Sequence, residues 1–171
     1  TIISAAKMLQ KAPPDILYFA DSLGGMETSQ ISNLINTLRK YWKGSLGIHA
    51  HNNLGRAIAN SLTALDHGVT YVDVTVTGMG RGPGNAQTEY MLVEMQNKQK
   101  IKSDILPLLK LIKKHFEPMQ QKYKWGTNPY YYLAGKYGIH PTYVQEMLAT
   151  HFNESEILAA INQLKHSGGR R

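Results

Sequence analysis

The chain has 171 residues and a mass of 19.1 kDa, which suits one domain or a domain with an appendage. Hydrophobic residues make up 42% and charged residues 18%, a balance that argues against a largely disordered chain. Cysteine is absent, which excludes disulfides and thiolate metal sites and is compatible with a cytoplasmic location. No apolar run reaches the roughly 18 residues that span a bilayer, so we expect no membrane association.

The net charge is +7, and most of the excess lies between Lys98 and Lys124, which hold 8 lysines and 2 acids. Such a basic stripe, with Phe116, Tyr123 and Trp125 nearby, could bind nucleic acid or an acidic partner. The alternative is a solvated helix face whose core side is apolar. That core side would consist of Leu106, Leu108, Leu109, Leu111 and Ile112. We favour the helix, because no nucleic-acid-binding motif is present.

The first hundred residues alternate between two kinds of apolar pattern. Short apolar runs predict strands over residues 16–20, 45–51 and 69–76. Helical spacing predicts helices over residues 2–11, 29–42, 54–66 and 88–97. The inward faces of two of these helices are expected to be Ile31, Leu34, Ile35 and Leu38, and Ile58, Leu62 and Leu65. This alternation indicates an α/β fold with parallel strands joined by helical crossovers.

Past residue 100 the pattern changes, and no further strand is expected. Helices are predicted at about 103–121, 130–137, 141–150 and 154–165. Asn153, followed three residues later by Glu156, resembles a capping box at the start of the last of these. We therefore divide the chain into residues 1–100, the α/β part, and residues 101–171, an all-helical domain.

His49 and His51 form the strongest local signal for chemistry. Side chains two residues apart on a strand project from the same face, so the two imidazoles are expected to lie together. Their place at the carboxyl end of a strand, beside the amides Asn52 and Asn53, favours half of a divalent-metal site. The alternative is a pair of histidines at the surface or engaged in hydrogen bonds.

Residues 78–85 (GMGRGPGN) form a glycine-rich loop that could approach a ligand closely. Its spacing is not that of a phosphate-binding loop, and no lysine follows it. Arg81 could pair with an anionic substrate or remain a surface cation. Asn85 could ligate a metal through its amide oxygen or cap the helix that follows.

Asp21 stands at the end of the first predicted strand, in the polar sequence DSLGG. It could accept a hydrogen bond from a substrate or orient a histidine from behind. The alternative is a residue that only holds the loop or caps a helix.

Three motifs together resemble the second half of the DRE-TIM metallolyases, the HMGL-like superfamily. They are ADSLGG (20–25), HAHNNLG (49–55) and GMGRGPGNAQTE (78–89), and the resemblance covers about residues 16–97. It implies the C-terminal portion of a TIM (β/α)8 barrel, with the three strands here as strands six to eight. In look, the chain is most similar to the 4-hydroxy-2-oxovalerate aldolases of this superfamily.

The resemblance also implies roles for individual residues. His49 and His51 match the two histidine ligands of a divalent metal, Mn²⁺ or Mg²⁺, with Zn²⁺ or Co²⁺ as alternatives. Asn85 matches the glycine-loop asparagine at or near that metal, and Asp21 an acidic position near the substrate. The implied chemistry cleaves or forms a carbon–carbon bond of a 2-oxo acid through a stabilised enolate.

The helical end resembles the small C-terminal domain of the 4-hydroxy-2-oxovalerate aldolases, which docks an acylating aldehyde dehydrogenase. Such a partner, or a second copy of the chain, is therefore expected at this end. In those aldolases a tyrosine lies near the metal, and the segment 125–132 (WGTNPYYY) is the counterpart here. Tyr130 is our choice among its tyrosines.

A TIM barrel needs eight strands and about 250 residues, whereas three strands are found here. The family's first-strand motif, with the aspartate that is the third metal ligand, is absent from this sequence. We therefore expect the chain to be the C-terminal part of a longer enzyme, inactive alone and prone to gain strands from a partner. Alternatives are an acyl-CoA-using synthase or lyase of the superfamily, or a protein-docking module with a vestigial metal site.

Overall fold

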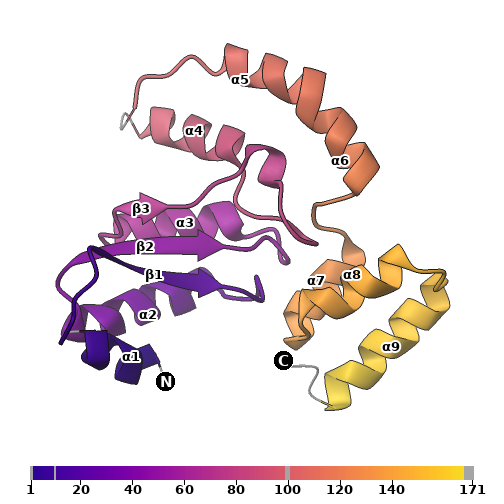
Figure 1. Ribbon diagram of the computed structural model, residues 1–171, viewed down its shortest axis with the longest axis horizontal. Helices are drawn as coiled ribbons and strands as arrows, with labels where there is room; N and C mark the ends of the chain where they lie inside the picture. Colours follow the sequence, from indigo (N-terminus) through magenta and orange to yellow (C-terminus); the bar gives the residue numbers. More distant parts are fainter. Residues whose placement is uncertain (1, 10, 99–100, 168–171) are drawn as a thin grey trace.

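A computed structural model describes residues 2–9, 11–98 and 101–167 (Figure 1). The elements of the first part are α1 (Ile2–Leu9), β1 (Ile16–Asp21), α2 (Thr28–Tyr41), β2 (Ser45–Ala50), α3 (Ala57–Asp66), β3 (Tyr71–Val72), η1 (Val76–Gly78) and α4 (Thr88–Asn97). Those of the second part are α5 (Leu106–Leu111), the π-helical turn η2 (Ile112–Phe116), α6 (Glu117–Tyr123), α7 (Pro129–Tyr137), α8 (Pro141–Ala149) and α9 (Glu154–Ser167).

The sheet is parallel with strand order β1-β2-β3, which confirms the predicted alternation of strands and helices. β1 and β2 pair along six residues each, from Ile16 opposite Ser45 to Asp21 opposite Ala50. β3 is shorter than the predicted strand 69–76 and pairs only through Tyr71 and Val72. The pairing of β3 with β2 ends after the Asp73 amide, which donates to the Ile48 carbonyl, because the chain then diverges from β2 and enters η1.

Alternation along β2 decides which residues face the helices. Leu46, Ile48 and Ala50 are fully buried in the core that α2 covers. The buried residues of α2 are Ile31, Ile35 and Leu38, as its spacing predicts, and Leu34 is partly buried beside them. The intervening residues of β2, His49 among them, therefore lie on the opposite face of the sheet, which the helices leave open.

α3 begins at Ala57 rather than at residue 54, because the Asn52 side chain accepts a hydrogen bond from the Ala57 amide (3.1 Å). The predicted inward face of this helix is confirmed only for Ile58, which packs against the core, and is wrong for Leu62 and Leu65. Ile58, Leu62 and Leu65 are only partly buried. The buried residues are Ala57, Asn60, Ser61 and Ala64. Small side chains occupy the inner face because α3 packs against both β2 and α2.

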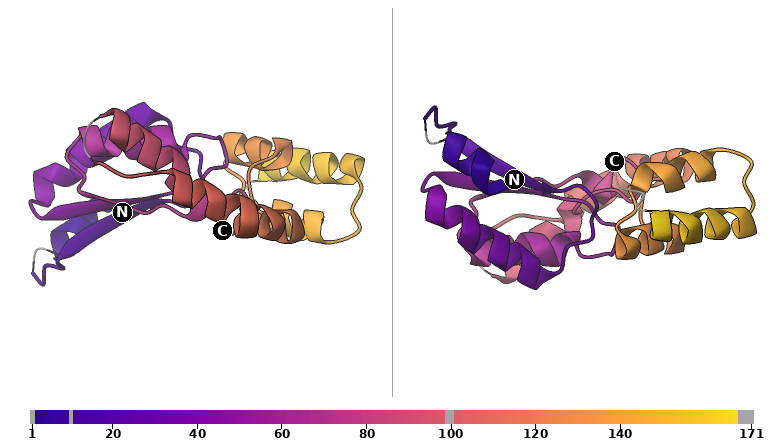
Figure 2. Two further views of the ribbon diagram at one scale, coloured as in Figure 1. Left: turned by 90° about the horizontal axis from the view of Figure 1, so that it is seen from above. Right: turned by 90° about the horizontal axis from the view of Figure 1, so that it is seen from below.

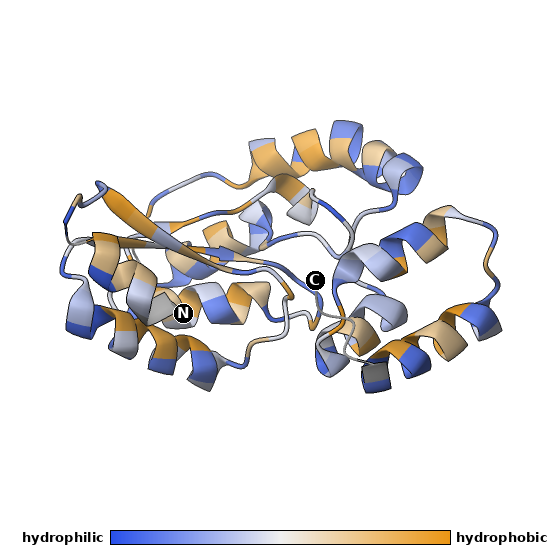
Figure 3. Cartoon of the chain, turned by 60° about the horizontal axis from the view of Figure 1, so that its bottom comes forward, coloured by the Kyte–Doolittle hydropathy of each residue, from blue (hydrophilic) through white to orange (hydrophobic). Residues whose placement is uncertain are grey.

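The α5–α6 segment carries the basic stripe, and hydrophobic and hydrophilic residues alternate along it (Figure 3). Its predicted core side is largely wrong. Leu106, Leu109 and Leu111 are 59%, 44% and 43% exposed, while Ile112 is buried. The leucines stay exposed because the segment packs against the rest of the described chain chiefly through η1.

Helices α7, α8 and α9 share a second hydrophobic cluster, centred on Tyr131, Ile139, Val144 and Ile161. They lie beyond the carboxyl ends of β1 and β2, and α8 and α9 project away from the sheet (Figures 1 and 2). The two separate clusters are compatible with a boundary near residue 100, which stays a prediction.

The predicted capping box of α9 is confirmed. The Asn153 amide donates to the Glu156 carboxylate (2.8 Å), and the Asn153 side chain accepts from the Glu156 amide (3.1 Å). We expect Asn153→Ala to lower the free energy of unfolding by about 1 kcal/mol, measured by urea denaturation. Asn162→Ala, at an exposed position inside the same helix, should cause no such loss. An equal loss in both variants would contradict the role of the cap.

Candidate functional site

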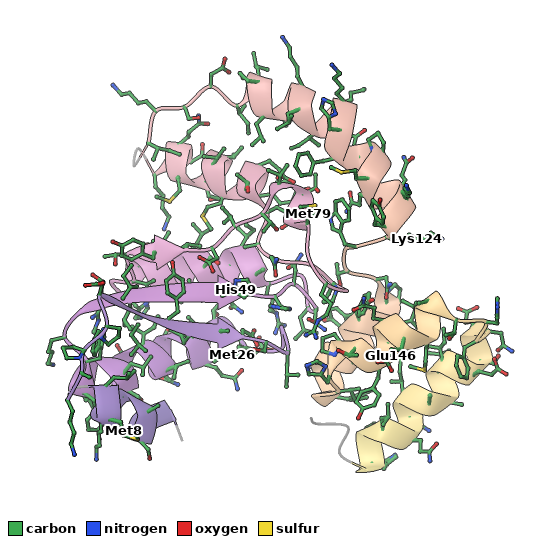
Figure 4. All side chains as sticks on the ribbon, in the orientation of Figure 1. Met8, Met26, His49, Met79, Lys124 and Glu146 are labelled. Carbon is green, nitrogen blue, oxygen red and sulfur yellow. The ribbon has the colours of Figure 1, made fainter. Side chains whose placement is uncertain are left out.

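The two histidines of the HAH sequence meet at the carboxyl end of β2, as their spacing predicts. Their ring centroids lie 5.1 Å apart, with the rings at 70° to each other. Figure 4 labels His49, which lies on β2. Nδ1 of His49 lies 3.1 Å from the carboxylate of Asp73, just after β3. That contact orients the His49 ring and leaves its other nitrogen available to a ligand.

His51 is electrostatically suited to bind a cation through nitrogen. Burial, together with the charges of His49, Arg81 and His140, lowers its pKa from 6.5 to about 4. Its Nδ1 is buried without a hydrogen-bond partner among the described residues. The imidazole is therefore neutral at physiological pH, the form that a metal requires.

Asn85 lies directly beside this pair. An isolated antiparallel bridge joins it to His51, and its side-chain nitrogen donates to the Met79 carbonyl (3.4 Å). The amide oxygen is therefore the atom that remains for a cation. Gln87, not Asn85, is the N-cap residue of α4, so the predicted capping alternative is wrong.

Asp21 is 4% exposed and holds the loop that follows β1. Its carboxylate accepts hydrogen bonds from the amides of Gly25 (3.3 Å) and Met26 (3.0 Å). Burial raises its pKa above 3.8, and the hydrogen bonds from the loop oppose that shift. The geometry gives Asp21 a structural task, while a contact with substrate stays a prediction.

The raised pKa of Asp21 makes the folded state bind its proton more tightly than the unfolded state does. The ionised carboxylate therefore costs stability above the folded-state pKa, and this cost disappears as the pH falls through that value. We expect wild-type protein to gain stability relative to Asp21→Asn between pH 7 and pH 4, measured by urea denaturation. A stability difference that stays constant, or changes in the opposite sense, would contradict this.

Arg81 reaches from the glycine loop to the helical part of the chain. Its guanidinium donates to the Thr142 hydroxyl in the first turn of α8 (3.2 Å). The Arg81 side chain is exposed, and its charge acts on His51 and on Tyr131 of α7. Four of the sequence-predicted residues thus lie near the carboxyl end of β2: His49, His51, Asn85 and Arg81.

Tyr130 does not share this neighbourhood. Partial burial and a hydrogen bond with Glu154, at the start of α9, raise the pKa of its hydroxyl. Tyr131 instead lies against the glycine loop, with its ring and hydroxyl 3.2–3.3 Å from where a Cβ of Gly82 would stand. Tyr131, rather than Tyr130, therefore lies beside the loop that carries Arg81 and Asn85, and a role for either tyrosine stays a prediction.

The segment between α6 and α7 fastens the loops of the site. The Trp125 indole donates to the Thr77 carbonyl (3.1 Å), and the Gly126 amide donates to the Gly82 carbonyl (2.9 Å). The Thr127 hydroxyl donates to the Asn53 carbonyl (2.9 Å). Lys124, labelled in Figure 4, precedes this strap, which we define as Trp125–Thr127. The strap couples the helical part to both ligand-bearing loops.

Sequence reasoning missed Asp73 and Thr142. It singled out the segment 125–132, which contains the strap and Tyr131, but not the contacts that these residues make. Asp73 carried a usable signal, since it follows a strand that neighbours the histidine strand. The others lie in helices or turns whose placement depends on long-range packing. Among the residues that the structure describes, no three His, Asp or Glu side chains form a metal cluster, and no helix is long and apolar enough to cross a bilayer.

The curated proteins most similar to this chain include several named 4-hydroxy-2-oxovalerate aldolase. A 4-hydroxy-2-oxovalerate aldolase from Carboxydothermus hydrogenoformans is 40% identical over 53% of this chain and 27% of that protein. One from Bacillus cereus is 28% identical over 99% of this chain and 51% of its own length. The chain thus spans at most about half of these curated relatives.

The solved structures that resemble this chain include an aldolase-like protein and a lyase. The N-terminal domain of a suggested aldolase from Bacteroides vulgatus has a TM-score of 0.80 and 34% identity, covering 92% of this chain and 52% of its own. The Bacillus subtilis HMG-CoA lyase has a TM-score of 0.59 and 25% identity over 73% of this chain and 43% of its own.

The carboxyl transferase domain of Rhizobium etli pyruvate carboxylase shares the fold, with a TM-score of 0.69 and 17% identity, over 98% of this chain and 30% of that one. The three parallel strands of the present chain and their helices form part of the TIM barrel found in these neighbours. A family model described as HMGL-like matches residues 1–113, and the chain therefore belongs to the HMGL-like family.

Proposed function

We propose that this chain is the C-terminal part of a divalent-metal-dependent aldolase that acts on a 2-oxo acid. The observation that carries the proposal is the pair His49 and His51, neutral at His51 and joined to Asn85, at the carboxyl ends of the strands. Catalytic residues of TIM barrels lie at that end. The relatives named 4-hydroxy-2-oxovalerate aldolase support this substrate class.

The residues present fit part of a metal site. His49, His51 and Asn85 would hold the ion, and imidazole and amide donors are compatible with Mn²⁺, Mg²⁺, Zn²⁺ or Co²⁺. A bound divalent ion supplies a Lewis acid for the negative charge that develops on the 2-oxo oxygen. Asp73 keeps the His49 ring oriented, and Arg81 adds positive charge beside the pair.

Two imidazoles and one amide leave the ion without a carboxylate ligand from the described residues. We propose that the missing ligand comes from a segment of the same protein that is equivalent to the part of the relatives that this chain does not match. Residues 1–171 alone are therefore expected to be inactive.

Residues 1–100 would form the catalytic part and residues 101–171 a helical domain. An acyl-CoA-using reaction of the same family is the alternative chemistry, and a cytoplasmic location stays a prediction.

The test is metal-dependent release of pyruvate from 4-hydroxy-2-oxovalerate by the longest native polypeptide that contains this sequence. We expect turnover that EDTA abolishes and Mn²⁺ restores, and that His49→Ala removes without unfolding the protein. Turnover that persists in EDTA, or in the folded His49→Ala variant, would refute the proposal. A thioester substrate turned over in its place would favour the acyl-CoA alternative.

A second candidate function is docking of a protein partner by the helical end. A groove of about 530 Å³ runs between α8 and α9, lined by Met147, Phe152 and Leu164, and Phe152 is half exposed. An acylating aldehyde dehydrogenase or a second copy of the chain would be the partner. Loss of that partner in a Phe152→Asp variant, which changes an exposed residue of the groove away from the histidine pair, with turnover intact, would support docking.

A further inference from the structure

Arg81 places a positive charge near His51. No carboxylate among the described residues forms an ion pair with it. The ion pairs found among the described residues involve His49, Arg56 and Lys98, not Arg81. Its hydrogen bond to Thr142 engages one N–H of the guanidinium and ends on a neutral hydroxyl. Four of the five guanidinium N–H groups therefore remain for a ligand.

The backbone around Arg81 is fixed although its side chain is exposed. The Gly84 amide donates to the Arg81 carbonyl (3.1 Å), and the Asn85 amide donates to the Gly78 carbonyl (3.1 Å). The strap holds Gly82 from the other side. The fixed backbone and the hydrogen bond to Thr142 together hold the Arg81 guanidinium where its charge acts on His51.

Tyr131 supplies a second polar group at the same place. Its side chain is 3% exposed, and its ring packs against Gly82. Its hydroxyl lies 3.3 Å from where a Cβ of Gly82, the residue after Arg81, would stand. Burial raises the pKa of this hydroxyl, and the charge of Arg81 opposes that shift. A phenol held here in its protonated form can donate a hydrogen bond to an anion that Arg81 attracts.

We infer that Arg81 and Tyr131 bind a second anionic group, carboxylate or phosphoryl, at the end of the substrate remote from its 2-oxo group. The inference rests on the proposed function and narrows its substrates: we expect 2-oxo acids with two negatively charged ends to be preferred over 4-hydroxy-2-oxovalerate, whose remote end is uncharged. The histidine pair faces one end, and the planar fork of Arg81 is suited to a carboxylate or phosphate at the other.

Titration calorimetry in the presence of Mn²⁺, on the longest native polypeptide that contains this sequence, tests the inference. The probes are 2-oxoglutarate and phosphonopyruvate, which carry a second charge, and 2-oxovalerate, which does not. We expect a charged probe to bind about 10–100-fold more tightly than 2-oxovalerate, the effect of one charge-assisted pair. The tighter of the two charged probes identifies the anion as carboxylate or phosphoryl.

Variants separate anion binding from structural roles. Arg81→Gln should abolish the preference and Tyr131→Phe should reduce it, while Lys114→Gln, which removes an exposed charge on η2, should retain it. Thr142→Val removes the partner of Arg81 in α8 and should also retain the preference. If Thr142→Val behaves like Arg81→Gln, Arg81 only ties the loop to α8, and the inference is wrong.

Equal affinity for all three probes, or no measurable binding of either charged probe, would also overturn the inference. The same titrations without probe report Mn²⁺ binding. Absent Mn²⁺ binding together with a retained preference would contradict the proposed function and support the anion site. The two claims can therefore fail separately.

Discussion

His51→Ala is expected to lower the affinity of the chain for Mn²⁺ by about 100-fold or more. The neutral imidazole at this position carries a lone pair and has no competing hydrogen bond at its buried nitrogen. Removal of a group that only orients a ligand costs about 10–100-fold in metal affinity, so loss of a ligand itself should cost at least as much. His49→Ala should have a similar effect.

Calorimetry or Mn²⁺ electron paramagnetic resonance measures this loss, with circular dichroism to confirm folding. Asp73→Asn, which weakens the contact that orients His49, should give a loss of about 10–100-fold. Asp66→Asn removes an exposed carboxylate paired with Lys98, and His115→Ala an exposed imidazole on η2. Both controls should bind Mn²⁺ like wild type. Equal losses in the controls would show that binding is not confined to the histidine pair.

Gly84→Ala is expected to lower the free energy of unfolding by about 2–5 kcal/mol, the sum of backbone strain and overpacking. Gly84 has φ of +76°, which side chains rarely adopt, and a Cβ there would collide with the Gly78 carbonyl oxygen. The loop would have to shift. Its hydrogen bonds from the Asn52 amide to Gly84 and from the Asn85 amide to Gly78 would then break. Because Asn85 would move away from His51, Mn²⁺ affinity should fall as well.

Gly55→Ala is the matched control for this variant. Gly55 also has a positive φ, +68°, but a Cβ there would meet no atom within 4 Å. It should therefore lose only about 1–2 kcal/mol, the strain alone, and keep its Mn²⁺ affinity. Urea denaturation of both variants gives the comparison. Equal losses of stability would mean that the close approach of Gly84 to Gly78 does not shape the site.

Local patterns were sufficient to predict the order of strands and helices and the meeting of His49 with His51. A period of two along β2 separates core residues from site residues, and this separation does not depend on the rest of the chain. The same reasoning failed for α3, where close packing against β2 and α2 selects small residues for the inner face. It also overestimated the burial of Leu106 and Leu109, which lack a covering element.

The remaining parts of the site depend on contacts between distant positions. Tyr130 and Tyr131 differ by one place in the sequence, and only the packing of α7 against the glycine loop distinguishes them. The strap acts mainly through backbone carbonyls, whose partners leave no trace in residue type. Arg81 was recognised as a candidate cation, but its bond to Thr142 spans 61 positions.

We expect His49 and His51 to bind a divalent ion together. The most direct measurement is NMR of the imidazole resonances of this chain, which has 7 histidines, during titration with substoichiometric Mn²⁺. We expect the resonances of His49 and His51 to broaden first and together, while those of the exposed His67, His115 and His151 stay sharp. Uniform broadening of all the histidines, or sharp resonances for His49 and His51 at every Mn²⁺ concentration, would contradict this.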